Sequence, residues 1–136
     1  MDNGYKKTRL ACFGGYIVQA IINNFLPILF VVFRREYGLS YESLGRIIFI
    51  NFFTQIFADL LSPLIVRVIG YKGSAVVCHF LAVSGLVLLA VLPNIIGNTY
   101  LAIILSVVVY AFGSGVIEVV ISPMTELLPT KNKSGN

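Results

Sequence analysis

The sequence has little charge. Charged residues make up 12% of its 136 residues, hydrophobic residues make up 57%, and the mean hydropathy is +0.89. Soluble domains carry about 25% charged residues and about 45–50% apolar residues. A chain with so few charges cannot cover a water-facing surface. The composition therefore predicts an all-α, multi-pass membrane protein, because helices satisfy their own backbone hydrogen bonds in lipid.

Residues that build metal, redox and nucleotide sites are also scarce. His79 is the one histidine, and Cys12 and Cys78 are far apart inside apolar runs, so neither a zinc motif nor a disulfide framework is indicated. The sequence contains no HExxH and no GxxxxGK[ST] motif. We therefore expect no catalytic residues, no metal, no cofactor and no enzymatic activity. The net charge of +4 comes from scattered basic residues rather than a continuous patch, so nucleic acid is not expected as a partner.

Long apolar runs dominate what is present. Four of them reach the roughly 20 residues that a helix needs to cross about 30 Å of hydrocarbon. They lie at about 10–33, 43–66, 73–92 and 98–128, between a short N-terminus (1–9) and a polar tail (129–136). The sequence predicts four transmembrane helices separated by links near 34–42, 67–72 and 93–98.

The basic residues indicate the orientation. With the N-terminus inside, seven of them face the cytoplasm and three face outward. The inside set is Lys6, Lys7, Arg9, Arg67, Lys72, Lys131 and Lys133, and the outside set is Arg34, Arg35 and Arg46. By the positive-inside rule we expect a cell-membrane protein with both termini cytoplasmic.

Polar residues inside the apolar runs recur at helical spacing. They form three stripes, which are Tyr16, Gln19 and Asn23; Asn51, Gln55 and Asp59; and Ser114, Glu118 and Ser122. Such stripes turn either toward neighbouring helices, as interhelical hydrogen bonds, or toward a water-filled path. Three stripes with two carboxylates favour the path. Asn24 lies about 100° away from the first stripe.

Three stretches resemble the major facilitator superfamily, and within it the sugar-proton symporters related to fucose permease. They are "IINNFLP" in the first run, "VRVIGYK" (66–72) after the second, and "GSGVIEVVISP" (113–123), which is similar to the Gly-x-Gly-x-x-Glu-(x)4-Pro pattern of helix four. In the loop stretch Gly70 and Lys72 fit the superfamily motif, whereas Arg67 stands where the motif has Asp. The resemblance spans nearly the whole chain.

The resemblance implies secondary active transport by proton-coupled alternating access. Glu118 would couple the proton, and Arg67, Gly70 and Lys72 would belong to a gating loop. A neutral, sugar-like solute would be bound by Gln19, Asn23, Asn24, Ser114 and Ser122, because amides and hydroxyls both donate and accept hydrogen bonds. The superfamily has twelve helices, so this chain is expected to be an N-terminal part whose tail leads toward a fifth helix.

Two other classes remain open from the residues. A complete four-helix transporter acting as a dimer would resemble the small multidrug resistance family, whose essential carboxylate lies in the first helix, where this chain has none. A non-transporting membrane assembly protein would not explain the pattern around Glu118. We further expect bends at Pro27 and Pro123. A buried contact between Asp59 and His79 is also predicted, because each lies ten positions from a link centred near residue 69.

Overall fold

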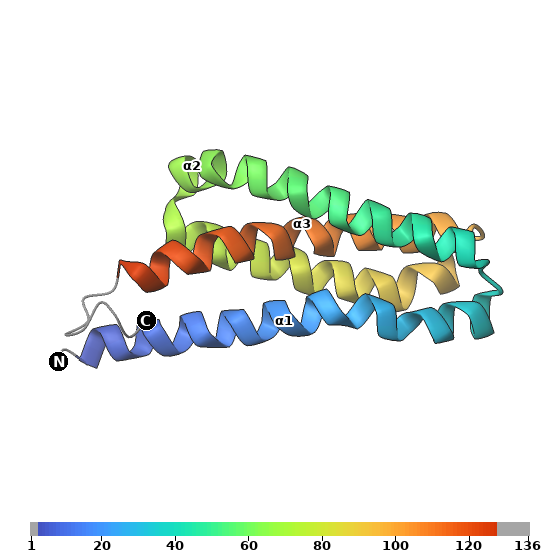
Figure 1. Ribbon diagram of the computed structural model, residues 1–136, viewed down its shortest axis with the longest axis horizontal. Coiled ribbons are helices and arrows are strands. Elements are labelled where there is room, and N and C mark those ends of the chain that lie inside the picture. The colour runs from blue at the N-terminus through green and yellow to red at the C-terminus, as the bar shows by residue number, and fades with distance from the viewer. Residues whose placement is uncertain (1–2, 128–136) are drawn as a thin grey trace.

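The computed structural model describes residues 3–127 as three α-helices (Figure 1). They are α1 (Asn3–Tyr37), α2 (Tyr41–Ile95) and α3 (Thr99–Glu126), and no strand occurs among these residues. Each helix is long and apolar enough to cross a membrane. The predicted all-α class is confirmed. Residues 1–2 and the tail from 128 onward, with Lys131 and Lys133, lie outside the described residues.

The helices extend further than the apolar runs. α1 begins at Asn3 rather than near residue 10, and the link to α2 shrinks from the predicted 34–42 to residues 38–40. Gly38 ends α1 with a left-handed φ of 63°, and the Ser40 hydroxyl caps α2 by accepting a hydrogen bond from the Ser43 amide at 3.1 Å. The predicted bounds were too narrow because they followed the apolar run, whose length matches the thickness of the hydrocarbon layer. The helix itself continues until a capping residue ends it.

The predicted link at 67–72 is not a loop. The helical backbone continues across it except at Gly70, whose φ of 71° and ψ of 169° fall in a region that essentially only glycine occupies. At this residue the chain reverses direction (Figure 1). The first arm of α2, residues 41–69, and the second arm, residues 71–95, therefore run in opposite directions along the bundle. The structure has three helices, and the second is broken at Gly70 into two arms that cover the second and third predicted runs, 43–66 and 73–92.

The prolines do not interrupt their helices. α1 continues through Pro27 to Tyr37, and α3 continues through Pro123 to Glu126. Bends at Pro27 and Pro123 remain a prediction, and the residue with non-helical dihedrals inside a helix is Gly70. Neighbouring helices and side chains can compensate for the hydrogen bond that a proline removes inside a membrane helix, which is why such prolines are tolerated.

α3 is the central helix, packed against both arms of α2. A Cβ added to Gly113 would lie 2.6 Å from the Cys78 carbonyl oxygen and 2.7 Å from the Ala82 nitrogen of the second arm. A Cβ added to Gly115 would lie 2.9 Å from the Ala58 Cβ of the first arm. Small residues let membrane helices approach this closely, and van der Waals packing then holds them together.

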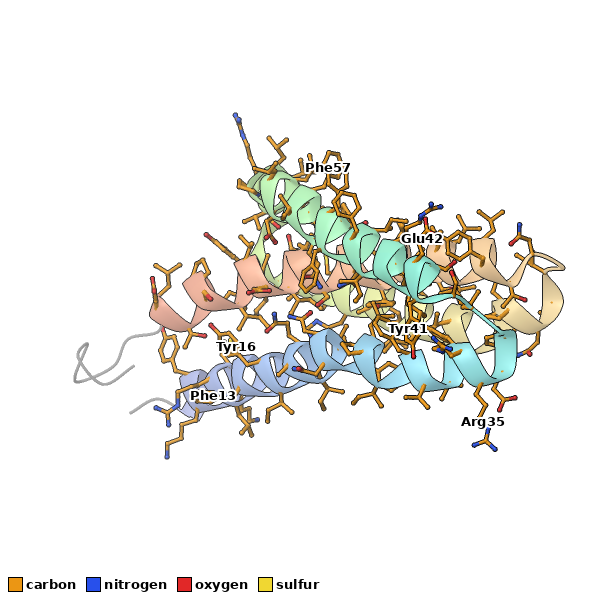
Figure 2. The ribbon with its side chains drawn as sticks, turned by 45° about the vertical axis from the view of Figure 1, so that its right-hand side comes forward. Phe13, Tyr16, Arg35, Tyr41, Glu42 and Phe57 are labelled. Atoms are coloured by element: carbon orange, nitrogen blue, oxygen red, sulfur yellow. The ribbon has the colours of Figure 1, made fainter. Side chains whose placement is uncertain are left out.

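The outer faces of α1 and α2 carry large apolar side chains. Ile28, Leu60 and Phe80 are each exposed over most of their surface, and Phe57 projects outward from the first arm of α2 (Figure 2). The most apolar part of α3, by contrast, is mostly buried. An apolar exterior around a tightly packed centre is the arrangement expected of a helix bundle in lipid.

Candidate functional site

The polar stripes of α1 and α3 meet side by side. Tyr16 Oη and Ser122 Oγ share a hydrogen bond of 2.9 Å. Gln19 Nε2 donates to Glu118 Oε2 at 2.7 Å, and Ser114 Oγ donates to Asn23 Oδ1 at 3.0 Å. Figure 2 shows Tyr16 on the side of α1 that faces α3. With Gln55, described below, we call these residues the polar seam: Tyr16, Gln19, Asn23, Gln55, Ser114, Glu118 and Ser122.

The antiparallel course of α1 and α3 produces this pairing. As α1 rises from Tyr16 to Asn23, α3 descends from Ser122 to Ser114, and both stripes repeat every three or four residues. One face of each helix therefore presents a polar group at the same level as its partner. The seam occupies the middle and the C-terminal third of α3, so two of the three predicted stripes form one structure.

Asn23 connects all three helices. Its Oδ1 accepts a hydrogen bond from Gln55 Nε2 of α2 at 3.0 Å as well as the one from Ser114 of α3. An amide oxygen has two lone pairs, and both are used here. Asn23 is thus the junction of the seam, in agreement with its predicted place on the first polar stripe, from which Asn24 lies about 100° away.

Glu118 lies on the open side of the seam. It is exposed, it forms no ion pair among residues 3–127, and the Gln19 amide is the side-chain group that donates to it. Eight residues separate it from Glu126 at the end of α3, which places it about 12 Å inside that end of the helix. The seam therefore presents an exposed carboxylate, within a helix apolar enough to cross a membrane, to whatever covers this face of the bundle.

The stripe on α2 is only partly connected to the seam. Gln55 takes part, whereas Asn51 Oδ1 and Asp59 Oδ1 are buried atoms without a hydrogen-bond partner among the described residues. Asp59 nevertheless lies within electrostatic reach of Glu118. Tyr110 Oη is a third such buried atom, and it belongs to no predicted stripe.

The predicted contact between Asp59 and His79 is not formed. His79 Nδ1 lies 2.7 Å from the Ala75 carbonyl oxygen of its own helix, and no ion pair joins it to Asp59 in the described part of the chain. The His79 ring lies near α1, since a Cβ added to Gly15 would be 3.8 Å from its Cε1. The sequence predicted that Asp59 and His79 lie at equal depth. Whether their side chains meet depends also on how each arm of α2 is rotated about its own axis.

The other predicted site residues lie apart from the seam. Asn24 is exposed, and its Nδ2 donates to the Ala20 carbonyl of its own helix at 2.8 Å. Arg67, Gly70 and Lys72 are exposed around the break in α2, and Lys72 lines a cavity there. The structure adds Tyr16 and Gln55 to the site. The signal that could have found them is their place in the predicted stripes.

The seam is closed in this structure. Its residues bond to one another, and they line neither the cavity beside Arg34 and Tyr41 nor the cavity beside Lys7 and Lys72, which lie at opposite ends of the bundle. Within residues 3–127 no group of three or more His, Cys, Asp or Glu side chains is placed to hold a metal ion. No protein-family model, curated protein or solved structure matches this chain.

Proposed function

We propose that the chain takes part in secondary active transport of a small, neutral, sugar-like solute by proton-coupled alternating access, with Glu118 as the proton-carrying group. The observation that supports this most is the position of Glu118, which is exposed on the outer side of a polar seam at membrane depth. The resemblance of residues 113–123 to the facilitator pattern supports the same assignment.

The proposal includes four membrane crossings. A straight helix of 55 residues would be about 80 Å long, far more than the roughly 30 Å of a hydrocarbon core. Each arm of α2 is about 40 Å long, which suits one crossing with its ends in the headgroup region. Two crossings by α2 leave both ends of the described chain on one side, which the basic residues assign to the cytoplasm.

The exposed side of the seam needs a polar neighbour. A carboxylate facing lipid costs at least about 2.5–3.5 kcal/mol, so ionisable residues in membrane helices face protein or a water-filled cavity. Further helices of the same transporter would supply the opposite wall of that cavity. The proposed translocation path thus runs along Gln19, Asn23 and Glu118.

The closed seam suggests how solute and proton are linked. Deprotonated Glu118 accepts the Gln19 hydrogen bond seen here, whereas protonated Glu118 is neutral and donates to a solute hydroxyl. Solute hydroxyls then replace the partners that Gln19 and Asn23 have in the closed seam, and such an exchange of hydrogen bonds has a small net free energy. Inward proton movement drives uptake with about 2.3 kcal/mol per charge per 100 mV of membrane potential.

The test is a transport assay on proteoliposomes that contain the product of the complete reading frame holding this chain. Radiolabelled neutral hexoses serve as probes, and a pH-sensitive dye reports proton entry. Glu118→Gln should retain solute exchange between the two sides and lose accumulation driven by a pH gradient, because the amide cannot release a proton. Glu126→Gln is the matched control, since Glu126 is exposed near the end of α3 and forms no part of the seam.

Two results would overturn the proposal. Accumulation that survives Glu118→Gln would remove Glu118 from proton coupling. No hexose-dependent proton movement in any variant would instead favour a membrane assembly protein, or a four-helix transporter whose seam is covered by a second copy. Crosslinking between cysteines introduced at position 118 of two copies separates these last two classes.

A further inference from the structure

A cavity of about 610 Å³ lies between all three helices at one end of the bundle. Its walls come from the first turns of α1, the second arm of α2 just after the break, and the end of α3. Figure 1 shows the start of α1, the break in α2 and the end of α3 at this same end of the molecule. The polar seam contributes no residue to the cavity.

The lining is divided between charge and apolar surface. Lys7 is the fifth residue of α1, and Lys72 is the second residue after the break, so both ammonium groups belong to the end of the bundle. Val76, Phe80 and Ile121 form apolar walls, and Phe80 lies about 12 Å further along the arm than Lys72. Among residues 3–127, no acidic residue lines the cavity.

The cavity at the opposite end is different. It is lined by Arg34 and Arg35, but the Arg34 guanidinium lies 3.6 Å from the centroid of the Tyr41 ring and is engaged there as a cation–π pair. Arg35 points away from the bundle (Figure 2). The pair of lysines over an apolar pocket is therefore a feature of one end of the molecule.

We propose that this cavity binds one anionic phospholipid, with its phosphate between Lys7 and Lys72 and one acyl chain along Val76, Phe80 and Ile121. The two positive charges complement an anionic headgroup, and the apolar walls complement a hydrocarbon chain. Residues 128–136 include Lys131 and Lys133 and no acidic residue, so this stretch offers no carboxylate side chain to the lysines. The lipid-site proposal requires that the chain is inserted in a membrane, and it does not require that the chain transports a solute.

The absence of tryptophan from the sequence makes a clean test possible. Phe80→Trp places a single fluorophore at the open, lipid-facing side of the cavity. The full chain is reconstituted in liposomes of unlabelled phosphatidylcholine that contain either brominated phosphatidylglycerol or brominated phosphatidylcholine. We expect phosphatidylglycerol to quench this tryptophan at a clearly lower mole fraction than phosphatidylcholine. The preference for phosphatidylglycerol over phosphatidylcholine should fall about fivefold for each lysine removed. The double variant Lys7→Gln with Lys72→Gln removes both lysines.

Matched controls separate a site from general surface charge. Lys6→Gln with Arg67→Gln removes the same charge from the same end without touching the cavity, and should leave the preference intact. A tryptophan at exposed Phe57 should be quenched equally by both lipids. Glu118→Gln should change nothing, so this test is independent of the transport proposal. Equal quenching of Phe80→Trp by both lipids, or equal loss of preference in both double variants, would overturn the lipid site.

Discussion

Asn23 and Asn24 are neighbours in sequence with opposite surroundings. The side chain of Asn23 joins three helices through two interhelical hydrogen bonds, whereas that of Asn24 bonds only to its own helix. Both residues were predicted to bind solute, and the structure retains only Asn23 in the seam. The difference arises because one step along a helix turns the side chain by about 100°.

We predict that Asn23→Ala lowers the free energy of unfolding in detergent by about 1–3 kcal/mol. Interhelical hydrogen bonds in membranes average about 0.6 kcal/mol and reach about 1.7, and two are lost here. Asn24→Ala should change it by less than about 0.5 kcal/mol, since the side chain is exposed. Titration with SDS, followed by circular dichroism, measures both variants. Equal effects would mean that the seam does not connect the helices as described.

At the scale of the helices, glycine has opposite roles at different places. Gly113 allows α3 to approach the second arm of α2, where an added Cβ would meet backbone atoms of Cys78 and Ala82. Gly14 of α1 is exposed, and an added Cβ there would have nothing within 4 Å. Packing therefore decides the effect of a substitution at Gly113, and helix propensity decides it at Gly14.

The sign of the effect should differ between these two glycines. Gly113→Ala should destabilise the bundle by about 1–3 kcal/mol, because backbone atoms of two helices must move apart. Gly14→Ala should stabilise it by up to about 1 kcal/mol through the higher helix propensity of alanine. The same SDS titration reports both values. A stabilising Gly113→Ala would contradict the close contact between α3 and α2.

At the scale of the whole molecule, the reversal at Gly70 decides which links share a side of the membrane. If α2 crosses twice, the α1–α2 link and the α2–α3 link lie on the same side, and if it crosses once they lie on opposite sides. The buried thiols of Cys12 and Cys78 can be replaced by alanine, which leaves a background without reactive cysteine.

We predict that single cysteines at Ser40 and Gly97 react in intact cells with a membrane-impermeant maleimide. A cysteine at Arg67, beside the break, should react only after the membrane is permeabilised. This pattern follows from four crossings with the basic residues inside. Labelling of Ser40→Cys without Gly97→Cys in intact cells would show that α2 crosses once.

The sequence by itself determined the class of protein and the polar stripes. Low charge and long apolar runs leave helices in lipid as the stable solution, and a period of three or four residues places Gln19 with Asn23 and Ser114 with Glu118 on single faces. These features are local, so they can be predicted from neighbouring residues. The all-α class is confirmed, and the stripes of α1 and α3 are found hydrogen-bonded to each other.

Only the tertiary structure decided which stripes meet. The antiparallel register of α1 and α3 paired Gln19 with Glu118, and the rotation of the α2 arms left Asp59 apart from His79. The backbone dihedrals of Gly70 replaced a predicted loop by a single-residue break. Register and rotation depend on close packing at positions such as Gly113, which involves residues far apart in the chain. Sequence periodicity fixes a face of one helix and contains no information about the helix that will cover it.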